Sequence, residues 1–543
     1  PRARLSIALP EAHSLLSSPA ISRDGRRVAF VASDGVNRPS LWVRALDEAD
    51  PRPLPGTEEA DQPFFSPDGE WIAFYARNQI LKVRVDGGAP VALAASTTHY
   101  GGAWMDDGRI VFKKSWNAGL HVVSERGGDA RALIDTAPPN EYAFVWPQAL
   151  PGGRAILFDV WGKKFETVLL DMKTLRRRVV APGLWRRIAW MRPGFLLGAA
   201  TAGELAALRL DASSGSTGDV VAVQKGVDTG GLDGEARFDA SWNGTLVYVR
   251  GFSGGQRLVS VNRRGEVARL PVAEGDFQAA RVAPDGRRAV VQSNGQLRVV
   301  DLERGTVTPL AAELEGAGGA QGSPVWSADG RTVTFSSNHE GSWNIYASPS
   351  SGSGAIAPVL KRPQDNSPHS YAPDGTLIFT TTGPSTGTDL WMMPPGGQAR
   401  AWLATAAEEQ EPRFSPDGRL VAFSSNVSGR FEVYVQARDN AVDRVQVSAA
   451  GGHMPAWSPK GDRLFFRQGN LVMESEIRTA GGLSATAPVR LFDTGFTIAP
   501  LGPFEPLPDG ERFLMVQRPR EAIPSRIEVV QGFVQELKAK VPR

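Results

Sequence analysis

The clearest copy of the pattern that organises this chain is Arg413-Phe414-Ser415-Pro416-Asp417-Gly418-Arg419-Leu420-Val421-Ala422-Phe423-Ser424-Ser425-Asn426. Pro416 fixes φ for a turn, Asp417 can accept hydrogen bonds inside it, and Gly418 tolerates the positive φ that closes it. On either side, apolar residues alternate with polar ones, as they do in half-buried strands. The stretch therefore predicts a strand, a tight turn and a second strand.

This turn occurs twelve times, which indicates an internal repeat. The copies are Ser22–Gly25, Ser66–Gly69, Met105–Gly108, Leu150–Gly153, Met191–Gly194, Ser241–Gly244, Ala283–Gly286, Ser327–Gly330, Ala372–Gly375, Ser415–Gly418, Ser458–Gly461 and Leu507–Gly510. An apolar strand follows each turn, then a third strand such as Leu41–Arg44 and often a short fourth such as Pro90–Leu93. Four strands in roughly 40–45 residues are typical of one blade of a β-propeller. We therefore predict an all-β fold.

The number of repeats predicts two propellers, because single rings usually hold about four to eight blades. We expect six blades each, with residues 1–275 in the first propeller and 276–543 in the second; a division into seven and five stays open. The N-terminal strand Arg4–Leu9 has no hairpin partner nearby. It can pair with the last repeat, at Arg526–Val530, or close the first ring, and either pairing would cover an exposed edge. Residues 532–540 have the spacing of a short helix.

Composition limits the classes of function. The 543 residues are 41% hydrophobic and 22% charged, as in a soluble protein of two or more domains. The net charge is +2 with scattered basic residues, so we expect no nucleic-acid partner. The absence of cysteine excludes disulfides and thiol chemistry. No apolar run reaches the roughly 18 residues of a membrane helix, so we expect no membrane segment in this chain.

The repeats resemble those of the TolB-type, or PD40, propellers. The whole chain is also similar to the extracytoplasmic propeller region of bacterial eukaryotic-like serine/threonine kinases. Three stretches carry this similarity best, namely Gln62–Gly69, Trp146–Pro151 and Arg512–Val516. The resemblance implies a periplasmic or secreted sensor module. It does not by itself specify a ligand, since propellers support many functions.

Protein kinases and serine hydrolases each have characteristic sequence motifs. The chain has no kinase signature: no Gly-rich loop with a Val-Ala-Ile-Lys strand, no His-Arg-Asp loop and no Asp-Phe-Gly. Gly251-Phe252-Ser253-Gly254-Gly255 matches the serine-hydrolase elbow, but an expected strand follows it where that elbow requires a helix. We therefore expect neither a kinase nor a hydrolase domain.

Polar residues gather where innermost strands are expected to begin. Successive blades present these positions around one mouth of a propeller channel, so residues far apart in sequence can meet there. The candidate ligand-binding residues are His369, Glu411, Arg413, His453, Glu505, Arg281, Asp61 and His99. Convergent polar groups in a concavity are the usual sign of a binding site.

The sequence thus predicts an extracytoplasmic binding or sensor module that recognises a peptide, glycan or protein partner. The alternative is an enzyme of the lyase or peptide-tailoring type. His369, His453, Glu411 and Arg413 would then be the catalytic candidates in the second propeller. No cofactor is predicted; a divalent metal held by His369 and His453 is the one addition that these residue types allow. In the third possibility, the same groups only pair with one another and hydrate the channel mouth.

Overall fold

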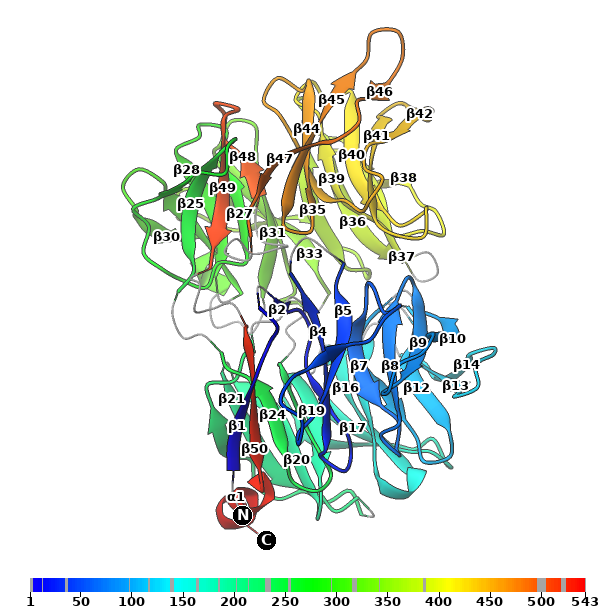
Figure 1. The fold of residues 1–543 in the computed structure, drawn as a ribbon. Helices are drawn as coiled ribbons and strands as arrows, with labels where there is room; N and C mark the ends of the chain where they lie inside the picture. The colour runs from blue at the N-terminus through cyan, green and yellow to red at the C-terminus, as the bar shows by residue number, and fades with distance from the viewer. Residues whose placement is uncertain are drawn as a thin grey trace. The chain divides into compact units, whose positions relative to one another are not determined.

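The computed structural model describes residues 3–542 apart from 12, 35–37, 97, 116–117, 137–140, 163–165, 184–185, 202, 213, 230–235, 252–254, 294, 315–319, 341, 384–386, 496–503 and 519–523. The described part is almost entirely β-structure (Figure 1). Its only α-helix is α1 (Phe533–Lys540), and two short 3₁₀ turns, η1 (Pro151–Gly153) and η2 (Ala312–Leu314), accompany the strands. Ser253 of the elbow-like motif lies outside the described residues.

The chain divides into two compact units. Unit 1 comprises Pro1–Ser253 and Glu521–Arg543, and unit 2 comprises Gly254–Arg520. This division differs from the predicted boundary after residue 275, and it assigns the C-terminal helix to unit 1.

Six sheets of unit 1 lie within the described residues. From the innermost strand outward they are β3 (Ala20–Ile21) with β2 (Ser14–Leu15), β4 (Arg27–Ser33), β5 (Ser40–Ala45) and β6 (Arg52–Pro53); β7 (Asp61–Phe65), β8 (Trp71–Ala76), β9 (Gln79–Arg84) and β10 (Val91–Ala95); β11 (Gly102–Trp104), β12 (Arg109–Lys113), β13 (Leu120–Ser124) and β14 (Arg131–Ile134); β15 (Glu141–Ala149), β16 (Ala155–Gly162), β17 (Glu166–Asp171) and β18 (Arg177–Pro182); β19 (Arg186–Met191), β20 (Phe195–Thr201), β21 (Glu204–Arg209) and β22 (Val221–Lys225); and β23 (Phe238–Ala240), β24 (Leu246–Val249), β50 (Arg526–Gln531) and β1 (Ala3–Ala8).

The described residues of unit 2 also form six sheets. In the same order they are β27 (Ala279–Val282), β28 (Arg288–Ser293), β29 (Gln296–Asp301) and β30 (Val307–Pro309); β31 (Gln321–Trp326), β32 (Thr332–Ser337), β33 (Asn344–Pro349) and β34 (Ala357–Leu360); β35 (Asn366–Tyr371), β36 (Leu377–Gly383), β37 (Gly387–Met393) and β38 (Arg400–Leu403); β39 (Glu409–Phe414), β40 (Leu420–Ser425), β41 (Glu432–Ala437) and β42 (Asn440–Gln446); β43 (His453–Trp457), β44 (Arg463–Gln468), β45 (Leu471–Arg478), β46 (Ser484–Ala485) and β47 (Val489–Asp493); and β48 (Phe504–Pro506), β49 (Arg512–Gln517), β25 (Arg257–Asn262) and β26 (Val267–Arg269).

The innermost strands of each unit contact one another in a closed cycle. In unit 1 the cycle is β3–β7–β11–β15–β19–β23 and back to β3; in unit 2 it is β27–β31–β35–β39–β43–β48 and back to β27. Hydrophobic clusters fill the spaces between neighbouring sheets, such as the one that joins Ala29 and Val31 of β4 to Ile72 and Phe74 of β8. Each unit is therefore a propeller, as the repeat predicts.

An exchange of strands between two repeats explains the altered unit boundary. The repeat with the Ser241 turn supplies β23 and β24 to unit 1, but its next strand, β25, pairs with β49 of unit 2, and β26 pairs with the other edge of β25. In return, β50 from the last repeat pairs with β24, and β1 covers its other edge (Figure 1). The N-terminal strand thus pairs with Arg526–Gln531 and also closes the first ring, so the two predicted alternatives are both realised.

This closure predicts an effect of mutations in β1. Ile7 is fully buried against Phe30, Val247 and Ile527, whereas Leu5, two residues earlier on the same face of the strand, is 38% exposed. We expect Ile7→Ala to lower the free energy of unfolding of unit 1 by about 2–4 kcal/mol, the usual cost of such a cavity. Leu5→Ala should cost less than about 1 kcal/mol. Urea denaturation checks this, and equal small effects would mean that β1 does not close the sheet.

The repeated turn has the predicted geometry. In the Ser415 copy, the Gly418 amide donates to the Ser415 carbonyl (2.8 Å), and Gly418 has φ +74°. Asp417 Oδ1 accepts from the Ser415 hydroxyl (2.6 Å) and from the Arg419 amide (3.1 Å). The same amide-to-carbonyl bond from the glycine closes all twelve turns. The aspartate therefore has a structural role in the turn.

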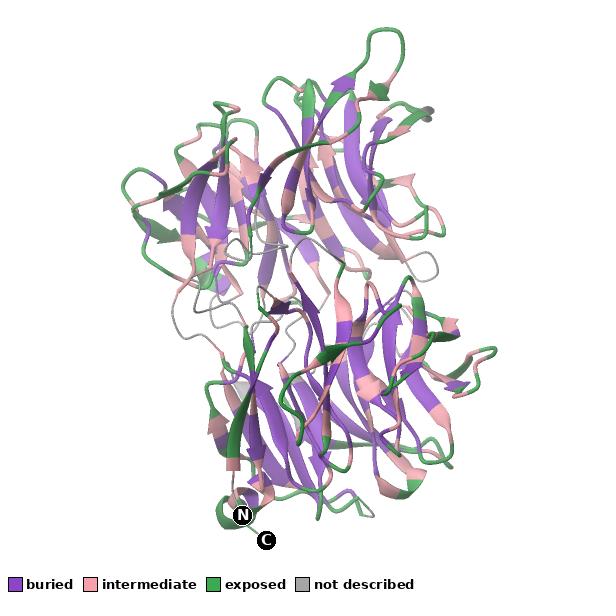
Figure 2. Ribbon diagram, viewed as in Figure 1, coloured by how far each residue is buried: buried purple, intermediate pink, exposed green. Residues whose placement is uncertain are grey.

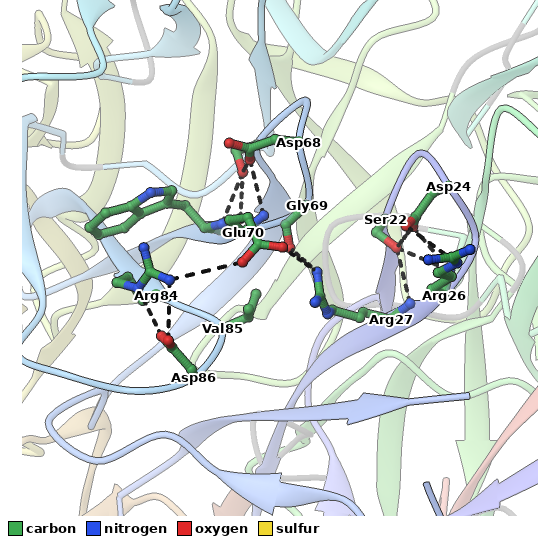
Figure 3. Close-up of polar contacts among 12 residues, drawn as sticks. Ser22, Asp24, Arg26, Arg27, Asp68, Gly69, Glu70, Arg84, Val85 and Asp86 are labelled. Carbon is green, nitrogen blue, oxygen red and sulfur yellow. Dashed lines mark hydrogen bonds and ion pairs between the residues drawn. The ribbon is translucent and has the colours of Figure 1, made fainter. Parts of the chain in front are cut away.

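Polar contacts join neighbouring sheets at these turns (Figure 3). The Arg27 guanidinium donates to the Gly69 carbonyl and to Glu70 Oε1 in the next sheet, both at 2.9 Å. Arg84 lies on the other side of Glu70 and also donates to Asp86 (2.9 Å). Such contacts fix the relative rotation of adjacent sheets within unit 1.

Burial is concentrated in the inner strands, while exposed residues occupy loops and outer strands (Figure 2). Helix α1 adds to the core of unit 1, where Phe533, Leu537 and Val541 pack against Phe238 and Leu246. It therefore packs against a blade. Within the described residues, no helix is both long enough and apolar enough to cross a bilayer.

Candidate functional site

Each propeller channel has two ends, which we name by the direction of the innermost strands. These strands begin at the strand-start mouth and run to the turn mouth, where the repeated turns lie. Most of the predicted site residues belong to the innermost strands of unit 2. They are held at the strand-start mouth or within the channel by the sheets described above.

Three charged residues of unit 2 form an ion network across the channel. Glu505 of β48 accepts hydrogen bonds from Arg281 of β27 and from Arg413 of β39. The strands β39 and β48 are not neighbours in the ring, so the Arg413 contact spans the channel. The Glu505 side chain is only 13% exposed. Each of the three residues stands two positions before the first residue of its turn. Their side chains therefore extend from the same height along the channel.

The electrostatics of this network hold Glu505 and Arg281 in their charged forms. Burial alone would raise the pKa of Glu505, but Arg413 and Arg281 together outweigh it and lower that pKa below its ordinary value. Burial and the neighbouring Arg413 lower the pKa of Arg281 to about 10, despite the opposing effect of Glu505. Arg281 therefore remains protonated at neutral pH.

Glu411 and His453 form a second group at the strand-start mouth. Glu411 Oε2 accepts hydrogen bonds from the Ser424 hydroxyl (2.8 Å) and the Met454 amide (2.6 Å). His453 Nδ1 lies 3.9 Å from the same oxygen, and its ring lies 5.0 Å from that of Phe431. The Glu411 carboxylate is thus oriented by fixed donors on two adjacent sheets.

His369 lies apart from the carboxylates. Its Nε2 is 3.1 Å from the Thr380 hydroxyl. Burial, with added repulsion from Arg281 and Arg413, lowers the pKa of His369 to about 3. At neutral pH this imidazole is uncharged, so it can orient a ligand but cannot supply a proton as an imidazolium.

The neutrality of His369 is directly measurable. We expect its imidazole ¹⁵N resonances to stay constant between pH 5 and pH 8, because its pKa lies below this range. The unfolded chain binds the proton near pH 6.5, so this residue should make the protein less stable as pH falls from about 6.5 towards 3. His369→Gln should remove that part of the acid dependence. Titration of the His369 resonance near pH 6 would contradict the assignment.

A polar pocket opens beside these residues. Its volume is about 190 Å³, and it is lined by Ser323, Ser367, His369, Thr380, Thr388, Gln410 and Glu411. These described lining residues carry hydroxyl, amide, imidazole and carboxylate groups. Such a lining suits a polar ligand bound by hydrogen bonds.

The two remaining predicted residues, Asp61 and His99, belong to unit 1. Asp61 Oδ2 lies 3.1 Å from His99 Nδ1, and the His99 ring stacks on Tyr75 with centroids 5.3 Å apart. The Tyr75 hydroxyl donates to the Gly101 carbonyl (2.6 Å). The structure therefore brings these two residues together within unit 1.

Sequence reasoning missed a buried polar group in the channel of unit 1. Asp239 accepts hydrogen bonds from the Ile21 amide (2.9 Å) and the Ala240 amide (2.8 Å). Burial raises its pKa, and Arg187 opposes that rise. Arg187 also donates to Gln62 Oε1 (3.2 Å). Asp239 stands two residues before its turn, as Arg413 does, so strict alignment of the repeats would have found it.

The predicted metal ligands do not fit a divalent cation. His369 faces two guanidinium groups, which repel a cation, and His453 is near Glu411 alone. Among the described residues, no group of three or more His, Cys, Asp or Glu side chains is arranged to hold a metal ion.

Comparisons with known proteins agree with the fold. Residues 241–460 match the family model described as TolB beta propeller domain, PD40. The uncharacterized protein Atu1656 of Agrobacterium fabrum is 28% identical over 194 residues, which are 35% of this chain and 65% of that protein. The match thus spans less than two thirds of the relative's length.

Two solved structures are similar. A TolB-like protein from Agrobacterium tumefaciens is 22% identical, with a TM-score of 0.40 over 49% of this chain and 99% of its own. TolB from Acinetobacter baumannii is 16% identical, with a TM-score of 0.34 over 64% of this chain and 79% of its own.

Proposed function

We propose that this TolB-like β-propeller protein is a binding module that receives a polar segment of a protein partner at the strand-start mouth of unit 2. The observation that carries the proposal is the polar pocket at that mouth, which His369, Gln410 and Glu411 line with four Ser and Thr residues. The Glu411 carboxylate is held there by hydrogen bonds from Ser424 and Met454. A rigid channel with pre-oriented polar groups binds a ligand at low entropic cost.

The charged and titratable groups nearby are poorly suited to proton transfer. Glu505 is paired with two guanidinium groups, Glu411 already accepts two hydrogen bonds, and the low pKa of His369 makes its imidazole a weak base. A general base needs a lone pair within reach of a proton on the substrate. Recognition by hydrogen bonds is therefore better supported than the lyase or peptide-tailoring alternative at this pocket.

The pocket lining favours a peptide backbone or short polar side chains as the bound group. Ser367 and Gln410 offer both donors and acceptors beside the Glu411 carboxylate. We further propose an extracytoplasmic location, which rests on the resemblance to TolB-type propellers and to kinase-associated sensor regions. The alternative to a peptide is a glycan or another small polar molecule as the ligand of this pocket.

Selection of a displayed random-peptide library on the full chain tests the proposal. Enriched peptides should bind Ser367→Trp, whose side chain would fill the pocket, at least tenfold more weakly than wild type. Gln79→Ala, at an exposed site on β9 of unit 1, is the control and should bind normally. Peptides that bind both variants equally would place the interaction elsewhere. Conversion of a bound peptide by catalytic amounts of protein would instead favour the enzyme.

A further inference from the structure

The turn mouths of the two channels differ at one repeated position, the residue directly after the first residue of each turn. In unit 2 this position holds only small or cyclic apolar residues, namely Pro284, Ala328, Pro373, Pro416, Pro459 and Pro508. In unit 1 it holds Arg23, Pro67, Asp106, Pro151, Arg192 and Trp242. Proline there serves the turn itself. At four of the six positions in unit 1, a charged or aromatic side chain stands in place of proline.

Arg23 reaches across the turn mouth of unit 1. Its guanidinium donates to Asp106 and to the Trp104 carbonyl, which belong to a sheet two places away in the ring. It also lies over the Trp242 indole, 4.0 Å from the ring centroid. With 17% exposure, the Arg23 side chain is fixed rather than solvated. Asp106 is equally constrained, because its second oxygen accepts from the Gly152 amide (2.9 Å).

Arg192 supplies a second guanidinium at the same indole. It lies 5.5 Å from the Trp242 centroid and is exposed. No carboxylate among the described residues lies within ion-pair distance of it. Asp106 already pairs with Arg23, so the Arg192 guanidinium is the one of these two that is available to an external anion. Repulsion between the two guanidinium groups adds to burial in lowering the pKa of Arg23, against the opposing effect of Asp106.

A cavity continues from this mouth into the channel. Its volume is about 70 Å³, and its lining combines aromatic residues such as Trp242 and Trp104 with the polar Arg23, Arg187 and Asp239. The cavity is too small to take a peptide side chain in full, so a ligand would bind at the mouth outside it. A guanidinium beside an indole at that mouth matches a carboxylate carried on an apolar segment, since the guanidinium fork pairs with planar oxyanions. One available guanidinium fits a monoanion better than a phosphate dianion.

We propose that the turn mouth of unit 1 binds the carboxylate of an acidic side chain on an aromatic peptide segment, with Arg192 as the anion-binding residue and Trp242 as the stacking surface. This site is distinct from the pocket of unit 2 and does not depend on the function proposed for it.

Fluorescence anisotropy with the full chain tests the site. The probe is a rhodamine-labelled, amidated peptide that contains Phe-Glu-Phe, compared with its Phe-Gln-Phe counterpart. We expect the Glu peptide to bind about tenfold more tightly, and Arg192→Gln to abolish that preference. Arg192→Lys should retain part of it. Arg419→Gln, which removes an exposed arginine near a turn of unit 2, is the matched control and should leave the preference unchanged.

Three results would overturn the proposal. An equal loss with Arg419→Gln would show that net charge, not the site, attracts the peptide. Undetectable binding of the Glu peptide at millimolar concentration would show that the turn mouth of unit 1 does not bind such peptides. Displacement of the peptide by inorganic phosphate at far lower concentration than by acetate, at matched ionic strength, would assign the site to phosphate instead.

Discussion

Glu505→Gln should lower the free energy of unfolding of unit 2 by about 3–5 kcal/mol. The substitution keeps the side-chain shape but removes the only carboxylate that holds Arg281 and Arg413 together within the described channel. Two guanidinium groups would then face each other in a partly buried site, where water screens their repulsion poorly. Urea denaturation followed by the fluorescence of the tryptophans measures the change.

Two controls separate this effect from a general loss of charge. Glu476→Gln breaks an exposed ion pair with Arg478 and should cost less than about 1 kcal/mol. Replacing Glu505, Arg281 and Arg413 together by Leu, Met and Met should restore most of the stability, because no unpaired charge remains buried. If Glu505→Gln is as mild as Glu476→Gln, the ion network does not stabilise the channel.

The stability that the ion network contributes should fall as the pH is lowered. The folded pKa of Glu505 lies below its ordinary value, so its contribution is complete above about pH 4.5 and is lost as pH falls through the folded pKa. Glu505→Gln should therefore show a flatter loss of stability in acid than the wild-type protein. A steeper acid dependence in the variant would contradict the lowered pKa.

Lys113→Met should raise the free energy of unfolding near pH 7, by roughly 3–5 kcal/mol as an upper estimate. The Lys113 side chain is fully buried at the end of β12, and burial lowers its pKa to about 7. The Tyr100 ring lies 5.6 Å from Nζ. Because the pKa of Lys113 is nevertheless lowered, its contacts do not offset in full the cost of removing the ammonium from water. Methionine has a similar volume and no charge.

The advantage of Lys113→Met should disappear as pH rises. Between about pH 7 and pH 10.5, the unfolded wild-type chain binds more protons at this position than the folded chain, so wild-type stability increases with pH. Lys114→Met is the matched control, because its neighbouring side chain is exposed and the substitution should change little. A destabilised Lys113→Met at all pH values would mean that the ammonium makes an essential interaction.

The repeat made the fold predictable, whereas the order of strands in the closing sheets was not. Each turn motif fixes the two strands that flank it, so β39 and β40 follow from Pro416, Asp417 and Gly418. The turn motif does not specify which third strand pairs with β40. In the closing sheets, β49 pairs with β25 and β50 pairs with β24, and both pairings are long-range. Strand exchange of this kind is invisible to a reading of successive repeats.

The candidate site was predictable in part for a similar reason. Arg281, Arg413 and Glu505 occupy one repeated strand position, so their convergence follows from the ring. Their ion pairs with one another argue against a catalytic role. These pairs depend on the length and burial of the side chains, which the spacing of residues in the sequence does not reveal. The buried Asp239 and the charged turn residues Arg23 and Arg192 needed comparison of equivalent positions between the two propellers.

Hydrogen–deuterium exchange of the full chain, with and without a saturating peptide from the library selection, tests the proposed function most directly. We predict protection of the strands that line the pocket of unit 2, namely β35, β36, β37 and β39. The outer strands of both units should exchange as before. Protection confined to outer strands, or to unit 1 alone, would contradict recognition at the strand-start mouth of unit 2.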